Sequence, residues 1–185
     1  MTSARHPSVL HIRPSRQMWG DVSVPGDKMI GQIGMLLAAM ADGDSTITGY
    51  PWFGENVRLP QALQGLGVVI DISGTAPQFP PGAAAPKTPA NTAVTQVKIR
   101  GCRRKLTPLC EPLDCGESGT ALRLLTAMLA GQSFATRMQA GAHLSSVKLQ
   151  PLLAVMGHMK ADIRPLGAAT ERPPFVISPA PLKGI

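Results

Sequence analysis

Residues 111–125 read Glu-Pro-Leu-Asp-Cys-Gly-Glu-Ser-Gly-Thr-Ala-Leu-Arg-Leu-Leu, and this stretch decides the fold. Leu113 to Cys115 is predicted to be a short strand and Gly116 a turn. A helix is predicted from Ser118 to Ala130, because apolar residues recur at three- and four-residue steps, at Leu122, Leu125, Met128 and Leu129. A strand that turns through glycine into a helix presents backbone N–H groups that attract anions, and the helix dipole adds to their pull. The stretch therefore predicts an α/β unit with its functional end at this turn.

The same order of elements occurs twice along the chain. In residues 21–72 the pattern predicts a strand at 21–24, a turn at 26–27, a helix at 29–41, a strand at 45–49, a helix at 56–66 and a strand at 68–72. In residues 113–164 the first strand, turn and helix are followed by a strand at 134–139, a helix at 146–156 and a strand at 159–163. Each repeat closes with one more strand, at about 94–100 and 174–178. The order is β-α-β-α-β-β, twice, with repeat 1 at about 21–100 and repeat 2 at about 113–178.

The remaining segments are a tail and a loop. Residues 1–15 are predicted to be a basic flexible tail, and residues 16–185 to form the folded domain. Residues 73–93 contain five prolines in 21 residues, which excludes a regular helix or a central strand. We expect a mobile Pro/Ala-rich loop there and assign it no chemistry, although a role as a lid is open.

Composition narrows the classes of function. The 185 residues carry a net charge of +7, which fits either a solvated basic tail or an interior that binds a small anionic ligand. Nucleic acid is not expected, because aromatic residues make up only 4% of the chain and no basic run appears. No apolar run is long enough for a membrane span. The odd number of cysteines, three, favours reduced thiols and a cytoplasmic setting, and no spacing indicates a metal ion or a cofactor.

Residues 111–125, together with Gly26-Asp27-Lys28, resemble the enolpyruvyl transferases of the shikimate pathway, the 5-enolpyruvylshikimate-3-phosphate synthase family. The resemblance covers about residues 16–185. It implies an α/β (α+β) fold in which parallel-rich β-α-β-α-β-β units pack with their helices inward, the inside-out α/β barrel. In that family two lobes of three units each bind substrate and phosphoenolpyruvate in the cleft between them. This chain corresponds to about one lobe minus a repeat.

The resemblance also shows where the chain departs from the family pattern. In the family the lysine that matches Lys28 contacts phosphoenolpyruvate. The serine and arginine that hold the shikimate carboxylate region are here Met29 and Ile33. The asparagine at the phosphoenolpyruvate site is here Glu117, whose carboxylate would repel an anion. The first anion site is therefore expected to be partly apolar.

A further family arginine stands just before a proline, and here Gln150 precedes Pro151 in a segment two residues longer. Lys148 could take over its charge. Arg123 matches the family and lies one turn into its helix, where its guanidinium can reach back over the N-terminus. Each lost charge-assisted anion contact costs about 1.5–3 kcal/mol. Three such losses would weaken binding by roughly three orders of magnitude.

The candidate site follows from these matches and departures. The candidate catalytic residues are Lys28, Glu117 and His143. The candidate substrate-binding residues are Asp27, Met29, Ile33, Ser118, Thr120, Arg123, Lys148 and Gln150.

Alternatives stay open for three residues, and a fourth has one expected role. Glu117 is either a carboxylate in the cap region or a repurposed acid. His143 is either an exposed loop residue or a general acid or base. Cys115 is either a buried structural thiol or a nucleophile. For His158, at a helix end, favourable interaction with the helix dipole is the expected role.

Three functions fit the sequence. The first is a diverged enzyme, possible in specialised metabolism, that acts on a small and less anionic metabolite without standard enolpyruvyl transfer. The second is one part of a split 3-phosphoshikimate 1-carboxyvinyltransferase that a partner chain completes. The third is a non-catalytic binding or regulatory subunit. Because the sequence ends before a third repeat, we expect a homodimer or a separate chain that supplies the missing lobe.

Overall fold

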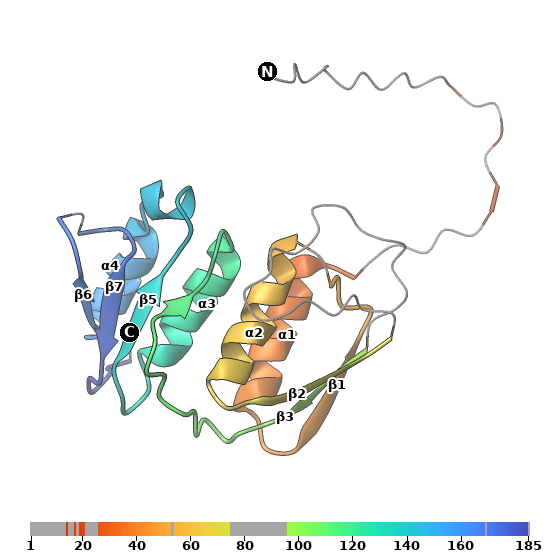
Figure 1. Cartoon of the computed structure of the whole chain (residues 1–185), viewed down its shortest axis with the longest axis horizontal. Helices are drawn as coiled ribbons and strands as arrows, with labels where there is room; N and C mark the ends of the chain where they lie inside the picture. Colours follow the sequence, from red (N-terminus) through yellow and green to blue (C-terminus); the bar gives the residue numbers. More distant parts are fainter. Residues whose placement is uncertain are drawn as a thin grey trace.

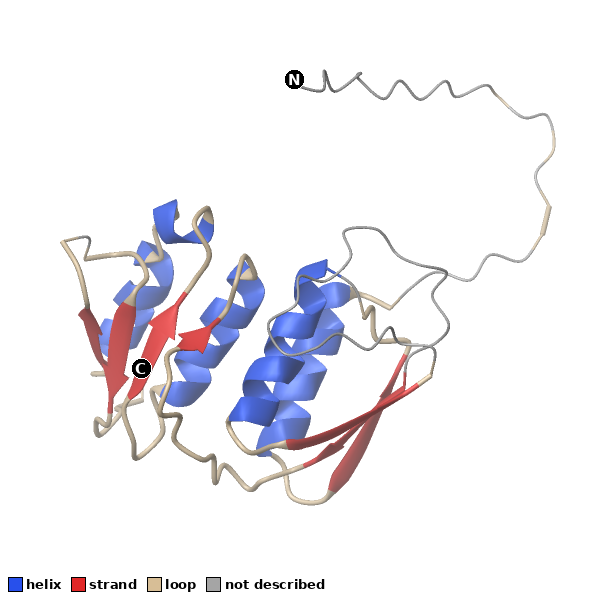
Figure 2. Ribbon diagram, in the orientation of Figure 1, coloured by secondary structure: helices blue, strands red, loops and turns tan. Residues whose placement is uncertain are grey.

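A layer of helices between two β-sheets forms the body of the molecule (Figures 1 and 2). The structure is a computed structural model that describes residues 14, 17, 19–20, 26–52, 54–74, 96–168 and 170–184. The predicted strand at 21–24, the tail apart from Pro14, and all but the first two residues of the predicted loop 73–93 lie outside the described residues.

The first unit follows the predicted order. Its elements are α1 (Lys28–Met40), β1 (Asp44–Thr48), the 3-10 helix η1 (Gly54–Val57), α2 (Arg58–Gly65), β2 (Val69–Ser73) and β3 (Gln96–Arg100). Each helix and strand lies within two residues of its predicted start, with η1 forming the first turn of the helix predicted at 56–66. The three strands form one sheet in the order β1-β3-β2.

The second unit repeats this arrangement. Its elements are β4 (Leu113–Asp114), α3 (Gly119–Leu129), β5 (Thr136–Gln139), the 3-10 helix η2 (Leu144–Ser146), α4 (Gln150–His158), β6 (Asp162–Pro165) and β7 (Phe175–Ser178). The strand order is β4-β5-β7-β6. In both units the closing strand lies between two earlier strands, which confirms the internal repeat at the level of the sheet.

The expectation of mainly parallel pairing is wrong for the described strands. Only β4 and β5, which are joined through α3, pair in parallel. The closing strands β3 and β7 each pair antiparallel with both of their neighbours. Because each closing strand inserts between two strands that run the same way, it reverses both pairings at once.

The last helix begins later than predicted. The pattern predicts a helix from residue 146, but α4 begins at Gln150, after η2 and a stretch in which Val147 is extended (ψ 131°). Pro151 explains the difference, because proline lacks the N–H that a helix interior needs and fits only the first turn. The following strand begins at Asp162 instead of 159, since Met159 caps α4 and Lys160 has a positive φ of 63°.

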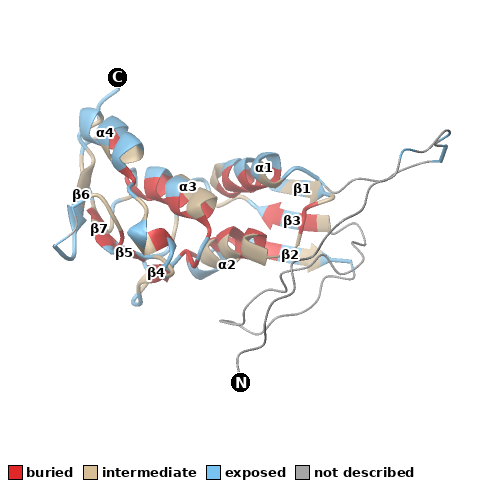
Figure 3. Cartoon of the chain, turned by 90° about the horizontal axis from the view of Figure 1, so that it is seen from above, coloured by how far each residue is buried: buried red, intermediate tan, exposed pale blue. Residues whose placement is uncertain are grey.

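The core lies between the helices and the inner faces of the two sheets (Figure 3). Fully buried side chains on α1 and α3 include Met35, Leu122 and Leu125. At Gly31 the helix lies so close to Tyr50 that a Cβ atom would be 3.0 Å from the tyrosine ring. Because α1, α2 and α3 contact one another, the two units share a single helical layer.

One face of α1 is apolar and exposed. Met29, Ile33 and Leu37 follow each other at four-residue steps, with Ile30 beside them, and these four residues are 55%, 40%, 57% and 74% exposed. We call them the α1 stripe. Helix α4 is also loosely covered, since Met156 is its one buried residue and Val155 is 46% exposed. Both helices therefore present apolar surface that the described residues leave exposed.

Candidate functional site

Three helices begin at the same end of the helical layer (Figures 1 and 2). Two long-range contacts tie their starts together. Gln32 in α1 donates from Nε2 to Oδ1 of Asn56, just before α2, over 3.4 Å. Arg58, the first residue of α2, lies against Gly116 before α3, where a Cβ atom would be 2.7 Å from Arg58 Nε. Since helix starts carry free N–H groups and a positive dipole end, this end of the layer favours negative charge.

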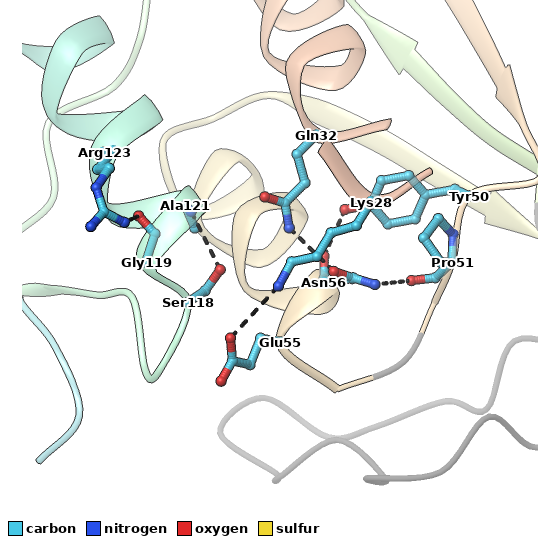
Figure 4. A network of polar contacts seen from close by, with 10 residues as sticks. All are labelled: Lys28, Gln32, Tyr50, Pro51, Glu55, Asn56, Ser118, Gly119, Ala121 and Arg123. Atoms are coloured by element: carbon cyan, nitrogen blue, oxygen red, sulfur yellow. Dashed lines mark hydrogen bonds and ion pairs between the residues drawn. The ribbon is translucent and has the colours of Figure 1, made fainter. Parts of the chain in front are cut away.

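The start of α1 holds the lysine predicted from the sequence (Figure 4). Asp27 caps the helix, because its Oδ1 accepts a hydrogen bond from the Ile30 N–H at 2.7 Å. The Lys28 Nζ lies 3.8 Å from Glu55 Oε2 in η1, and both side chains are 43% exposed. The lysine therefore already faces a carboxylate. Met29 is the next residue of the helix and Ile33 follows one turn later, and both are exposed apolar residues of the α1 stripe.

A buried polar cluster lies beneath the ion pair. Asn56 donates from Nδ2 to the Pro51 carbonyl at 2.9 Å, and Tyr50 donates its hydroxyl hydrogen to the Asn56 carbonyl at 2.7 Å. Gln32 is fully buried, and its Oε1 has no hydrogen-bond partner among the described residues. Burial raises the pKa of the Tyr50 hydroxyl above its ordinary value, which a hydrogen bond from Gln32 partly opposes. The phenol therefore stays protonated and keeps its hydrogen bond to the Asn56 carbonyl.

The start of α3 is built from the second glycine turn. Gly116 has a φ of +53° and donates its N–H to Asp114 Oδ1 at 2.8 Å. Ser118 is buried and caps the helix by accepting from the Ala121 N–H at 3.3 Å. Arg123 reaches back as expected, since its Nη1 donates to the Gly119 carbonyl at 2.9 Å. Its guanidinium is exposed at the helix start, where it can meet an anion.

Glu117 and Thr120 complete this end of α3. Thr120 is half-buried in the first turn. The carboxylate of Glu117 accepts hydrogen bonds from the N–H groups of His143, at 3.1 Å, and Leu144, at 2.8 Å. It thereby caps η2 and holds His143 beside the α3 turn. This geometry matches a capping carboxylate, and the exposed imidazole of His143 lies in the loop that Glu117 fixes.

Cys115 lies directly before the second glycine turn. Burial, and then the neighbouring Asp114 carboxylate, raise the pKa of the Cys115 thiol from 9.0 to about 12, while Arg58 acts in the opposite direction. The thiol is therefore protonated at neutral pH, as a structural cysteine would be.

Lys148 and Gln150 lie on the other side of η2. The Lys148 Nζ is 3.6 Å from Glu171 Oε2, and the next residue, Leu149, donates its N–H to the Glu171 carbonyl at 2.8 Å. Gln150 is the exposed first residue of α4. The contacts described for Lys148 thus join it to the Glu171 segment. His158 occupies the last turn of α4, where a cation would complement the dipole.

Arg58 is the residue that sequence reasoning missed. It stands in Val57-Arg58-Leu59, which repeats Val147-Lys148-Leu149 in the second unit. The one usable signal was this shared basic position, since Lys148 was a candidate and Arg58 was not. Gln32 and Asn56 gave no signal, because an amide in a helical pattern looks like any surface residue.

Two general features of the described part of the chain bear on function. Its helices are all too short or too polar to cross a membrane. The same residues contain no group of three or more His, Cys, Asp or Glu side chains arranged to hold a metal ion.

Known proteins resemble this chain over most of its length. The family model of EPSP synthase (3-phosphoshikimate 1-carboxyvinyltransferase) matches residues 12–185. A 3-phosphoshikimate 1-carboxyvinyltransferase of Citrifermentans bemidjiense is 32% identical over 177 residues, which are 94% of this chain and 36% of that protein. One from Lactiplantibacillus plantarum is 34% identical over 155 residues, 84% of this chain and 32% of that protein.

A solved structure shows the same fold. The EPSP synthase from Acinetobacter baumannii superposes with a TM-score of 0.71 at 30% identity, over 90% of this chain and 34% of that one. This chain therefore spans about a third of the length of the relatives it matches. With the family model matched across both repeats, the chain belongs to the EPSP synthase family.

Proposed function

We propose that this chain binds a small metabolite that is less anionic than the substrates named for its relatives, and that it does not carry out standard enolpyruvyl transfer. The observation that supports this most is the surface beside Lys28. Met29 and Ile33 are exposed in the first turns of the helix that Lys28 begins, and this lysine already faces Glu55. An anion there would meet a paired cation and apolar side chains, whereas an apolar ring would be covered by them.

The start of α3 supports one anionic contact. Arg58 and Arg123 lie at that helix start, and Ser118 and Thr120 lie in its first turn. A ligand with one carboxylate or phosphate could place it there and extend an uncharged body toward the α1 stripe. The proposed ligand therefore has a single anionic group and an apolar or uncharged body. Lys28, Glu117 and His143 are proposed as the polar groups that face it.

Calorimetric titration with shikimate-3-phosphate and phosphoenolpyruvate, singly and together, tests the proposal. We expect no micromolar binding of either compound to the natural sequence. The variant Met29→Ser/Ile33→Arg restores the two polar groups of the family pattern, and it should gain shikimate-3-phosphate binding. Two restored contacts of about 1.5–3 kcal/mol each correspond to at least a hundredfold in affinity.

A matched control separates a specific site from added charge. Ile30→Arg places the same cation on α1 at the 74% exposed position of the stripe. It should not reproduce the gain. Micromolar binding by the natural sequence would instead mean that the site of the relatives survives, and the proposal would be withdrawn in favour of a split transferase.

The split transferase is the second candidate, and the uncovered helices favour it. In the second unit α3 is covered by α1 and α2 of the first unit. By the same repeat geometry, α1 needs a neighbouring unit, and its exposed Ile30 and Leu37 lack one within the described chain. We propose that another β-α-β-α-β-β unit, from a separate chain, covers this face. Co-purification of such a chain, followed by enolpyruvyl transfer only in the mixture, would establish this function.

A cytoplasmic setting is part of the proposal. The three cysteines are all described and none forms a disulfide. Thiols at intermediate, exposed and buried positions fit a reducing compartment.

A further inference from the structure

We propose that Glu55 determines specificity at Lys28, because its carboxylate occupies the place that an anionic group of a ligand would take. This inference deepens the proposed function and rests on it. The observation is the ion pair between Lys28 Nζ and Glu55 Oε2, 3.8 Å apart at the start of α1 (Figure 4). The Glu55 carboxylate is thus a counter-ion supplied by the chain itself.

The backbone around Glu55 is held from three sides. The next residue, Asn56, is 3% exposed. Its side chain donates to the Pro51 carbonyl at 2.9 Å and accepts from Gln32 at 3.4 Å, and its own carbonyl accepts from the Tyr50 hydroxyl at 2.7 Å. The bond from Gln32 joins η1 to α1, so η1 cannot move away from α1 without breaking this buried bond, and the other two bonds join η1 to residues 50 and 51. Glu55 is therefore placed beside Lys28 by the fold and not by a chance side-chain rotamer alone.

The local charges then decide what kind of ligand group fits. Lys28 is one cation, and both Asp27 and Glu55 are carboxylates within this helix start. Asp27 is engaged with the Ile30 N–H, which leaves Glu55 as the group that competes with a ligand. A phosphate or carboxylate would have to displace Glu55 and remain close to it. A hydroxyl group can instead donate to the carboxylate of Glu55 and accept from Lys28. The inference assigns an uncharged, hydroxyl-bearing group to this position.

Removing the carboxylate tests the inference directly. The full chain and its Glu55→Gln variant are titrated with phosphoenolpyruvate and with inorganic phosphate into the high-millimolar range, and binding is followed by NMR shifts of the first α1 amides. An exposed ion pair is worth up to about 1 kcal/mol, so the variant should bind both anions about two- to fivefold more tightly. The gain should shrink as salt is added, since screening weakens exposed charges.

The control is a matched charge removal at the other end of α1. Asp42 pairs with Arg103 at 2.7 Å, just beyond the C-terminus of the helix. Asp42→Asn changes the net charge by the same amount and should leave anion affinity unchanged. The double variant Lys28→Gln/Glu55→Gln should lose the gain, because the freed cation is then absent. Thermal melts of each variant confirm that the compared proteins are folded.

Each result decides the question. A gain limited to Glu55→Gln and dependent on Lys28 supports the inference. Equal affinities for Glu55→Gln and Asp42→Asn, or no anion binding by Glu55→Gln at any concentration, would overturn it. The comparison is between variants, so it stands whatever the parent binds. The proposed function fails on a different result, which is micromolar binding of shikimate-3-phosphate or phosphoenolpyruvate by the unaltered chain.

Discussion

Individual side chains at this site are set by contacts that come from far along the chain. Gln32 meets Asn56 across 24 residues, and Arg58 lies on the turn at Gly116. The sequence could predict that Asp27, Lys28 and Arg123 lie at helix starts, because a glycine turn followed by a helical pattern marks where a helix begins. It could not predict the contact of Arg58 with the Gly116 turn or that of Gln32 with Asn56. The local sequence holds no information on which distant segment a side chain will contact.

The Cys115 thiol gives a pH prediction at this scale. Its pKa in the folded protein is about 12, above its ordinary value of 9.0. The folded chain therefore holds a proton that the unfolded chain releases, so stability is complete below pH 9 and falls as the pH rises toward 12. The loss should approach about 1.4 kcal/mol per pH unit within that window.

Urea denaturation at successive pH values, compared with Cys115→Ala, measures this term. The alanine variant should show a shallower decline above pH 9, whatever its stability at neutral pH. Cys110→Ala removes an exposed thiol and should keep the slope of the parent. If the free energy of unfolding falls equally steeply with pH in the parent and in Cys115→Ala, the pKa of the buried thiol is not raised by folding.

At the scale of elements, the local sequence pattern predicted the helices correctly except for the start of α4. It did not predict the direction of strand pairing in the sheets. The long helices carry apolar residues at helical spacing throughout, so α1 and α3 lie within one residue of their predicted ends. The start of α4 was misplaced because the apolar pattern continues upstream of Pro151, which alone sets the boundary. The predicted pairing direction was wrong because it depends on where the closing strand inserts into the sheet. The alternation of apolar and polar residues along a strand carries no information on that position.

Replacement by alanine should change the stability of the protein in opposite directions at Gly116, in the turn before α3, and at Gly157, in α4. Gly116 has a φ of +53°, and a Cβ there would lie 2.7 Å from Arg58 Nε. Gly116→Ala should therefore lower the free energy of unfolding by at least about 1–2 kcal/mol and displace Arg58. Gly157 lies within α4 with nothing within 4 Å, so Gly157→Ala should raise stability by about 0.5–1 kcal/mol.

Chemical denaturation of the two variants under one set of conditions measures both values. A neutral Gly116→Ala would mean that the turn can relax and that Arg58 is not fixed by it. A destabilising Gly157→Ala would mean that α4 is packed more tightly than its exposed surface indicates.

The whole molecule has a helical layer that is covered on its sheet sides and open beside α1 and α4. Among the described residues, the large apolar side chains that remain exposed on helices are the four of the α1 stripe and Val155 of α4. Exposed apolar surface on a helix is typical of an interface that another unit covers. The chain belongs to the EPSP synthase family and spans about a third of the length of its relatives. The unit proposed above to cover α1 would close this surface.

This surface should make the isolated chain associate with itself. Burying apolar surface contributes about 25 cal/mol per Å², so two α1 faces gain by meeting when no other unit is present. Leu37→Lys places a charge in the stripe and should shift the chain toward monomer in sedimentation velocity runs across a concentration series.

Val69→Lys is the matched control, because Val69 is 50% exposed against 57% for Leu37 and lies on β2, away from the helical layer. If Val69→Lys reduces self-association as much as Leu37→Lys does, the two chains do not meet through the α1 stripe. A parent that stays monomeric at every concentration would mean that the stripe is too small to hold two chains together, leaving a complementary unit as the one partner that it fits.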